Sequence, residues 1–182
     1  MRAVLQITSV GVPRGNRPSE RYVRRAGSWG RMPTELRSIA VAVDGSANAD
    51  DALALAIDLA RRYSASLTVL AIAPLPAAFV FPNEPTPPPV LESDTPRFRA
   101  LVDAGVERAR AAGVSAAEGI CEEGPPVDTI LALLHDHPVD LLVVGSRGLS
   151  TAKRILLGSV SAGLVNHAPC PVLVVRPKVT TP

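Results

Sequence analysis

The amino-acid sequence predicts an α/β fold, a single doubly wound domain in which helices cover both faces of a parallel sheet. From Ser38 onwards, short runs rich in Val, Ile and Leu alternate with longer segments of helical periodicity. These runs are continuously apolar, as expected for parallel strands that are buried on both faces. Because crossovers between parallel strands are right-handed, this alternation places helices on both faces of the sheet. The length of 182 residues suits one such domain with some excess chain.

The first strand, the first helix and the second strand are predicted between Ile39 and Ala73. Ile39–Val43 is a short apolar run rich in β-branched residues that ends at a turn sequence, so we expect a buried strand. Asn48–Tyr63 is expected to be a helix that Ser46 or Asn48 caps, because acidic residues stand in its first turn and arginines in its last. Leu67–Ala73 is the next continuous apolar run and is predicted to be the second strand.

Three more helices and three more strands are predicted from the same signals. Gly113 and Pro138 each indicate the end of a helix. The helices are expected over Arg97–Ala112, from Pro125 or Pro126 to His135, and over Gly158–His167, and the strands over Val114–Cys121, Val139–Val144 and Val172–Val175.

A proline-rich connection separates the second strand from the second helix. Residues 74–96 hold eight of the 18 prolines of the chain. Proline donates no backbone hydrogen bond and disrupts a helix interior, so this segment can neither pair within a sheet nor form a helix. We expect a long, partly polyproline-like loop.

The N-terminal segment, residues 1–36, has neither strand nor helix periodicity and contains several glycine and proline breakers. Residues 1–31 carry seven arginines and one glutamate, a net charge of +6, so the rest of the chain sums to −4 within the overall +2. We interpret this leader either as a mis-assigned start, with Met32 as the natural first residue, or as a disordered, Arg-rich arm. The folded domain is then expected over residues 37–177, followed by a tail at 178–182.

The composition excludes several classes of protein. Hydrophobic residues make up 47% of the chain and charged residues 20%, which is enough for a buried core and argues against general disorder. No apolar stretch approaches the roughly 18 residues of a membrane span, and two cysteines cannot build a disulfide framework or a four-cysteine zinc site. The basic charge is confined to the leader, and aromatic residues, which stack on bases, are only 3%. We therefore expect a cytoplasmic protein with no membrane or nucleic-acid partner.

A glycine pattern near the C-terminus is the most informative chemical signal. Gly145-Ser146-Arg147-Gly148 follows a predicted strand, and nine residues later Gly158-Ser159-Val160-Ser161 opens a helix. In doubly wound folds, ligands bind beyond the carboxyl ends of the strands, where the strand order reverses. Helix N-termini offer backbone amides and partial positive charge to an anion, and glycines let it approach. The guanidinium group of Arg147 could also bind the anion, and the hydroxyls of Ser159 and Ser161 could donate hydrogen bonds to it. The pattern therefore predicts a phosphate site.

This constellation resembles the universal stress protein family. The resemblance is carried by the Gly-x2-Gly-x9-Gly-Ser motif from Gly145 to Ser159, by Ala168–Val175, and by Asp44-Gly45-Ser46 after the first strand. It covers about residues 37–177. In the nucleotide-binding branch of that family the fold is a five-stranded parallel sheet in the order 3-2-1-4-5. The strands that precede Asp44 and Gly145 are then neighbours.

The resemblance also implies an ATP site. Asp44 would hold the ribose hydroxyls, the backbone around Ile72 would bond the adenine edge, Ala42 would line the base and Gly145 would adjoin the ribose. The phosphates would lie in a cradle made by the following positions: Gly148, Gly158, Ser159, Val160 and Ser161. Mg²⁺ or Mn²⁺, where present, would be held by phosphate oxygens and water, so no protein metal ligands are expected.

Two site residues also have simpler interpretations. Asp44 can cap the turn before the first helix, although its place beside the glycine motif favours ribose binding. Ser159 can serve as an ordinary helix N-cap, with or without a ligand.

Three functions remain open from the sequence. The first is an ATP-binding stress-response regulator that forms a homodimer through the edge strand Val172–Val175, as the resemblance implies. The second is a slow ATPase or autophosphorylating protein, although no catalytic base is evident and neither a Walker motif nor a kinase Asp-Phe-Gly motif occurs. The third is a dimeric interaction module that needs no nucleotide. We expect no catalytic residues.

Overall fold

A computed structural model describes residues 35–74, 94–148 and 157–176. These residues belong to one compact unit, Pro33–Pro182. The predictions for the leader at 1–34, for residues 75–93 of the proline-rich connection and for the tail at 178–182 lie outside the described residues.

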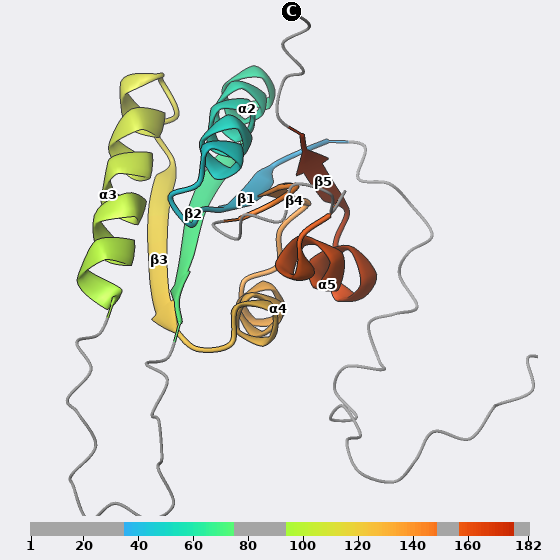
Figure 1. Ribbon diagram of the computed structural model, residues 1–182. Coiled ribbons are helices and arrows are strands. Elements are labelled where there is room, and N and C mark those ends of the chain that lie inside the picture. Colours follow the sequence, from blue (N-terminus) through green and yellow to red (C-terminus); the bar gives the residue numbers. More distant parts are fainter. Residues whose placement is uncertain (1–34, 75–93, 149–156, 177–182) are drawn as a thin grey trace, which may run out of the picture. The chain divides into compact units, whose positions relative to one another are not determined.

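Five strands form one parallel sheet in the order β3-β2-β1-β4-β5 (Figure 1). All four neighbouring pairs are parallel, and Ala42 at the end of β1 aligns with Leu70 of β2 and Val144 of β4. The strands are β1 (Ser38–Ala42), β2 (Ser66–Ala73), β3 (Ala117–Glu123), β4 (Leu141–Gly145) and β5 (Val172–Val175). The predicted sheet and its strand order are confirmed.

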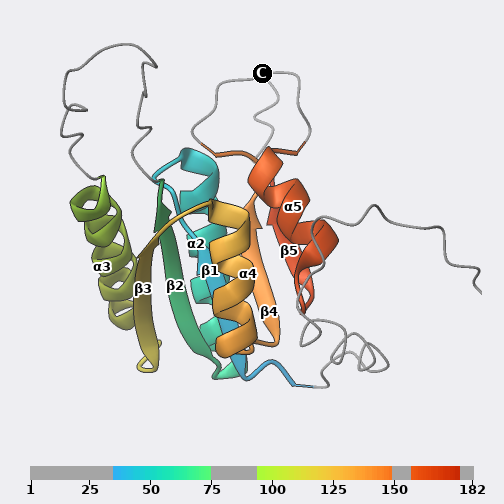
Figure 2. The same ribbon diagram turned by 90° about the horizontal axis from the view of Figure 1, so that it is seen from below.

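In the described part of the chain, four helices cover the sheet, two on each face, which confirms the prediction that both faces are covered (Figures 1 and 2). Helices α2 and α3 pack on one face, and α4 and α5 pack on the other. Their bounds are α2 (Ala47–Tyr63), α3 (Thr95–Ala111), α4 (Pro126–Asp136) and α5 (Ser159–His167). None of these helices is both long and apolar enough to cross a membrane.

The core has two layers because successive strand residues point to opposite faces of the sheet. In β1, Ile39 and Val41 pack toward α2 and α3, whereas Ala40 packs toward α4 and α5. Small and branched aliphatic side chains fill both layers, and Phe98 is the buried aromatic residue among the described ones. This packing holds the carboxyl ends of β1, β2 and β4 at one edge, where the site lies.

The third strand begins three residues later than predicted, at Ala117 instead of Val114. Gly113 has φ +94°, a left-handed conformation that turns the chain at the end of α3. The amide of Val114 bonds back to the Ala109 carbonyl in the last turn of α3 at 3.0 Å, so Val114 closes the helix end and does not join the strand.

Candidate functional site

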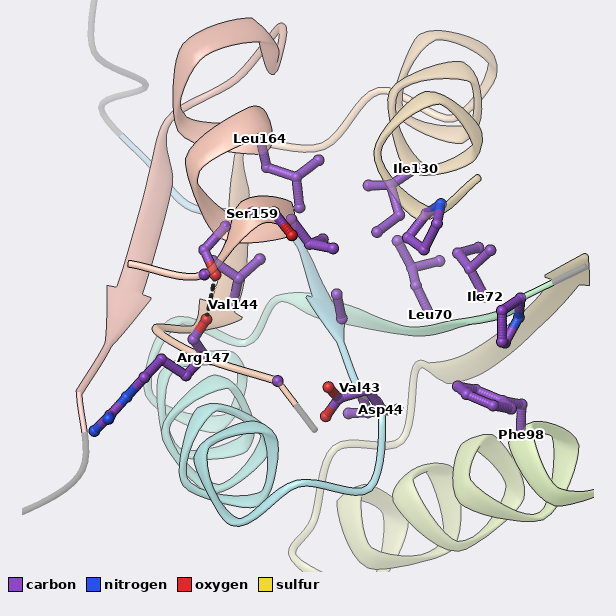
Figure 3. A pocket seen from close by; sticks show the side chains of 18 residues that line it. Val43, Asp44, Leu70, Ile72, Phe98, Ile130, Val144, Arg147, Ser159 and Leu164 are labelled. Atoms are coloured by element: carbon purple, nitrogen blue, oxygen red, sulfur yellow. Dashed lines mark hydrogen bonds between the residues drawn. The ribbon is translucent and has the colours of Figure 1, made fainter. Parts of the chain in front are cut away.

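A cavity lies at the carboxyl ends of β1, β2 and β4, beside the N-termini of α4 and α5 (Figure 3). Its volume is about 220 Å³, whereas one water needs roughly 10–15 Å³, so it has room for a small organic molecule. All ten positions proposed from the sequence line it, namely Ala42, Asp44, Ile72, Gly145, Arg147, Gly148, Gly158, Ser159, Val160 and Ser161. The fold therefore brings together residues that are up to 119 positions apart in the sequence.

Asp44 caps the turn before α2 with one carboxylate oxygen, and its other oxygen has no donor among the described residues. Its Oδ1 accepts a hydrogen bond from the Ser46 amide at 2.9 Å, which closes the turn before α2. The turn needs glycine at the next position, because Gly45 has φ +83°. The second oxygen, Oδ2, faces Gly148 so closely that a Cβ there would collide with it. Among the described residues, no group donates a hydrogen bond to Oδ2, so it remains available to a ligand hydroxyl.

Gly145 and Gly158 are glycines for different reasons. A Cβ on Gly145 would lie 2.8 Å from the carbonyl carbon of Asn48, so its missing side chain lets the start of α2 pack on the end of β4. A Cβ on Gly158 would meet only ordinary contacts, the nearest being the Arg147 Cα at 3.5 Å, and φ is −68°. Among the described residues, packing therefore requires glycine at 145 but not at 158.

The N-terminus of α5 opens onto the cavity with amides that no other described residue pairs. Gly158 is the N-cap residue, so the expectation that Ser159 serves as the N-cap is wrong. Glycine has no side chain to cap the helix, and the first helical bond is from the Ala162 amide to the Gly158 carbonyl at 2.9 Å. The amides of Ser159, Val160 and Ser161 therefore have no carbonyl within the helix to pair with. Such amides, at the positive end of the helix dipole, form an anion site.

Two other groups at this helix end are already bonded within the protein. The Ser161 hydroxyl donates to the Gly145 carbonyl at 2.8 Å, and this residue is only 5% exposed. The Gly158 amide donates to the Ser146 carbonyl at 2.8 Å. These two hydrogen bonds hold α5 against the end of β4. Within the described part of the chain, the Ser159 hydroxyl and the amides of Ser159–Ser161 remain as donors for an anion.

Arg147 lines the cavity, but its guanidinium group does not point into it. Figure 3 shows its guanidinium pointing away from Asp44, so the charged fork does not reach across the cavity in this conformation. Its carbonyl accepts hydrogen bonds from Asn48 Nδ2 at 3.2 Å and from Ser46 Oγ at 3.5 Å.

Sequence reasoning missed most of the apolar wall of the cavity. The missed residues are Val43, Leu70, Pro74, Phe98, Pro126, Ile130, Val144 and Leu164. In Figure 3, Leu70, Ile72 and Ile130 stand together on one side of the cavity. The strand-end residues among them could have been found from the rule that ligands bind at the carboxyl edge. Phe98, Ile130 and Leu164 depend on how their helices dock, which no local pattern reveals.

The cavity thus combines an apolar wall, one carboxylate and a helix N-terminus. This arrangement suits a molecule with a flat apolar ring, a hydroxyl-bearing middle and an anionic end. Across residues 35–74, 94–148 and 157–176, no three His, Cys, Asp or Glu side chains gather closely enough to hold a metal ion.

The comparison with protein families decides the family. The model of the universal stress protein family matches residues 35–176. The chain belongs to this family. Among curated relatives, a Staphylococcus haemolyticus protein assigned to the universal stress proteins is 35% identical over 156 residues, which are 80% of this chain and 93% of that protein.

Solved structures of universal stress proteins share the fold. One from Lactobacillus plantarum is 27% identical with a TM-score of 0.61, and the match covers 78% of this chain and 99% of that one. A second, whose structure is that of its complex with cAMP, is 30% identical with a TM-score of 0.57 and coverages of 78% and 98%. Some structural neighbours of this universal stress protein therefore bind adenine nucleotides.

Proposed function

We propose that this universal stress protein binds ATP and acts as a nucleotide-dependent regulatory protein in the stress response. One observation carries the proposal: the ten positions expected to hold ATP line a single cavity that has an apolar wall and an anion-binding helix end. The neighbour crystallised with cAMP, at 30% identity, supports an adenine nucleotide as the class of ligand.

Each part of the cavity suits one part of ATP. The adenine ring fits the apolar wall beside Leu70, Ile72 and Ile130, since burying a flat ring there removes apolar surface from water. The ribose hydroxyls suit Asp44 Oδ2, which has no donor among the described residues. The phosphates suit the exposed Gly148 and the amides of Ser159–Ser161. Mg²⁺ or Mn²⁺, where it accompanies ATP, would be held through the phosphates.

We further propose that β5 pairs with its counterpart in a second copy, giving a homodimer. β5 is an edge strand, and its four residues are all only partly buried. The carbonyls of residues 171 and 175 accept hydrogen bonds from β4 and the residue that follows it. Because alternate residues of a parallel strand face opposite neighbours, Val172 and Val174 direct their N–H and C=O groups away from β4, toward the open edge of the sheet. Such an unpaired edge is suited to pairing with another strand. Nucleotide binding would then change the surface that the dimer offers to a partner.

Two measurements test the nucleotide proposal. Mass spectrometry of small molecules released on denaturation is expected to find an adenine nucleotide in protein purified from its host. Calorimetric titration with ATP, ADP, AMP and cAMP is expected to give one ATP site per chain. A higher affinity for cAMP than for ATP would mean that cAMP, and not ATP, is the ligand. The absence of any nucleotide binding would overturn the proposal.

A further inference from the structure

The turn after β4 has three successive carbonyls, each bonded to a different partner. The Gly145 carbonyl accepts from the Ser161 hydroxyl at 2.8 Å, and the Ser146 carbonyl accepts from the Gly158 amide at 2.8 Å. The Arg147 carbonyl instead accepts from Asn48 Nδ2 at 3.2 Å, a residue of α2 that lies 99 positions away in the sequence. The orientation of every peptide unit in this turn is therefore set from outside the turn.

The last of these bonds determines where the Gly148 amide points. In a trans peptide the N–H lies opposite the C=O, and the described residues contain no cis peptide. Because the Arg147 carbonyl points to α2, the Gly148 N–H in the same peptide unit points away from α2. The Gly148 nitrogen lies 3.8 Å from where a Cβ of Gly158 would stand, so this amide is beside the open end of α5.

Asn48 is not needed as the helix cap. Ser46 is the N-cap residue of α2, and its hydroxyl accepts from the Ala49 amide at 3.3 Å. The Ser46 hydroxyl also approaches the Arg147 carbonyl, but at 3.5 Å this bond is at the limit of a hydrogen bond. The close approach of α2 that Gly145 allows brings the Asn48 amide within reach of the turn.

We propose that Asn48 is a positioning residue: through the Arg147 carbonyl it fixes the Gly148 amide in the direction of a bound phosphate. This inference rests on the proposed function, because it assigns Asn48 to the phosphate end of the same cavity. The first turn of α2 would then serve the anion site without touching the ligand, as groups that orient binding residues do elsewhere.

The Asn48→Ala variant tests the proposal with two ligands and one spectrum. ATP affinity is expected to fall about three- to tenfold, the value of one hydrogen bond, while adenosine affinity stays unchanged because adenosine has no phosphate. In the ¹⁵N–¹H spectrum of the ligand-free protein, the Gly148 amide peak is expected to shift, and the Val160 peak to stay. An equal loss for ATP and adenosine, or an unmoved Gly148 peak, would overturn the proposal.

Ser38→Ala is the matched control. The Ser38 hydroxyl donates to Asp140 Oδ2 at 3.0 Å. Like the bond of Asn48, this side-chain hydrogen bond joins residues about 100 positions apart, but it lies at the opposite end of β1 from the cavity. This variant is expected to lower the unfolding midpoint without changing affinity for either ligand. Failure of the wild-type protein to bind ATP would overturn the proposed function and the ligand role of Asn48 together, whereas an unmoved Gly148 peak overturns the positioning alone.

Discussion

Asp44 uses its two carboxylate oxygens differently, and this allows its two roles to be separated. Oδ1 closes the turn with the Ser46 amide, and an Asn side chain can accept the same bond. Asp44→Asn is therefore expected to leave stability unchanged but to weaken ATP binding about tenfold, because a charged acceptor bonds a hydroxyl more strongly than a neutral one. Calorimetry gives the affinities.

The control ligand for this variant is 2′,3′-dideoxy-ATP, which lacks both ribose hydroxyls. Its affinity is expected to be the same for the wild-type protein and for Asp44→Asn. A comparable loss with both ligands would mean that Asp44 does not act on the ribose.

Two glycines of the motif are expected to respond differently to a single methyl group. Gly145→Ala places its Cβ against the backbone of Asn48, which cannot yield as a side-chain end can, so stability should fall by about 1–3 kcal/mol. Gly158→Ala meets only ordinary contacts, so its stability should change little. Its methyl group lies at the cavity, however, and is expected to weaken ATP binding. Urea unfolding and calorimetry of both variants measure the contrast, and equal losses of stability would contradict it.

At the scale of helices and strands, the junction of α5 and β5 contains a buried thiol. Cys170 is 7% exposed, and this burial raises the pKa of its thiol from 9.0 to about 11, against a smaller lowering by a hydrogen bond to the backbone of Leu142. Between about pH 9 and pH 11 the unfolded chain has lost this proton and the folded chain still holds it. The folded state then binds more protons, so stability must fall as pH rises through this window.

Comparison with Cys170→Ala isolates the contribution of this thiol. Urea midpoints measured from pH 8 to pH 11 are expected to decline more steeply for the wild-type protein than for the variant, since other alkaline groups are common to both. Parallel curves would show that Cys170 ionises equally in the folded and unfolded chain.

The elements themselves were largely predictable from the sequence, because each signal was local. Apolar runs indicated β1, β2, β4 and β5, and the alternation of strand and helix signals indicated that helices cover both faces of the sheet. The error at the third strand came from turn chemistry: Gly113 lets Val114 bond back to the helix, although its side chain is β-branched. The apolar pattern alone does not distinguish such a residue from the start of a strand.

The site was predictable only where the sheet places its residues. Asp44 and Gly148 each follow a strand, so the carboxyl-edge rule brings them together, and their contact confirms that juxtaposition. Phe98 and Leu164 reach the same cavity from helices whose docking depends on the whole core. Asn48 was equally hidden, because its partner carbonyl lies 99 residues away and only the folded chain brings the two together.

At the scale of the whole molecule, the strand order explains why the site lies where it does. β1 and β4 are central neighbours, and their connections leave toward opposite faces of the sheet, α2 on one and α5 on the other. The chain therefore separates at their carboxyl ends and leaves a crevice that none of the described helices fills. At the opposite ends, the starts of β1 and β4 are instead held together by hydrogen bonds, since Asp140 accepts from both the amide and the hydroxyl of Ser38.

The proposed dimer can be tested by one proline in the edge strand. Val174 directs its amide away from β4, so Val174→Pro removes an outward donor and leaves the β4–β5 ladder intact. The wild-type protein is expected to have twice the chain mass of 19.0 kDa in light scattering, and the variant the mass of one chain. The variant should keep its fold and its ATP site, because β5 contributes no residue to the cavity lining. Val174→Ala keeps the amide and is expected to remain dimeric. A dimeric Val174→Pro variant would place the interface on a surface other than β5.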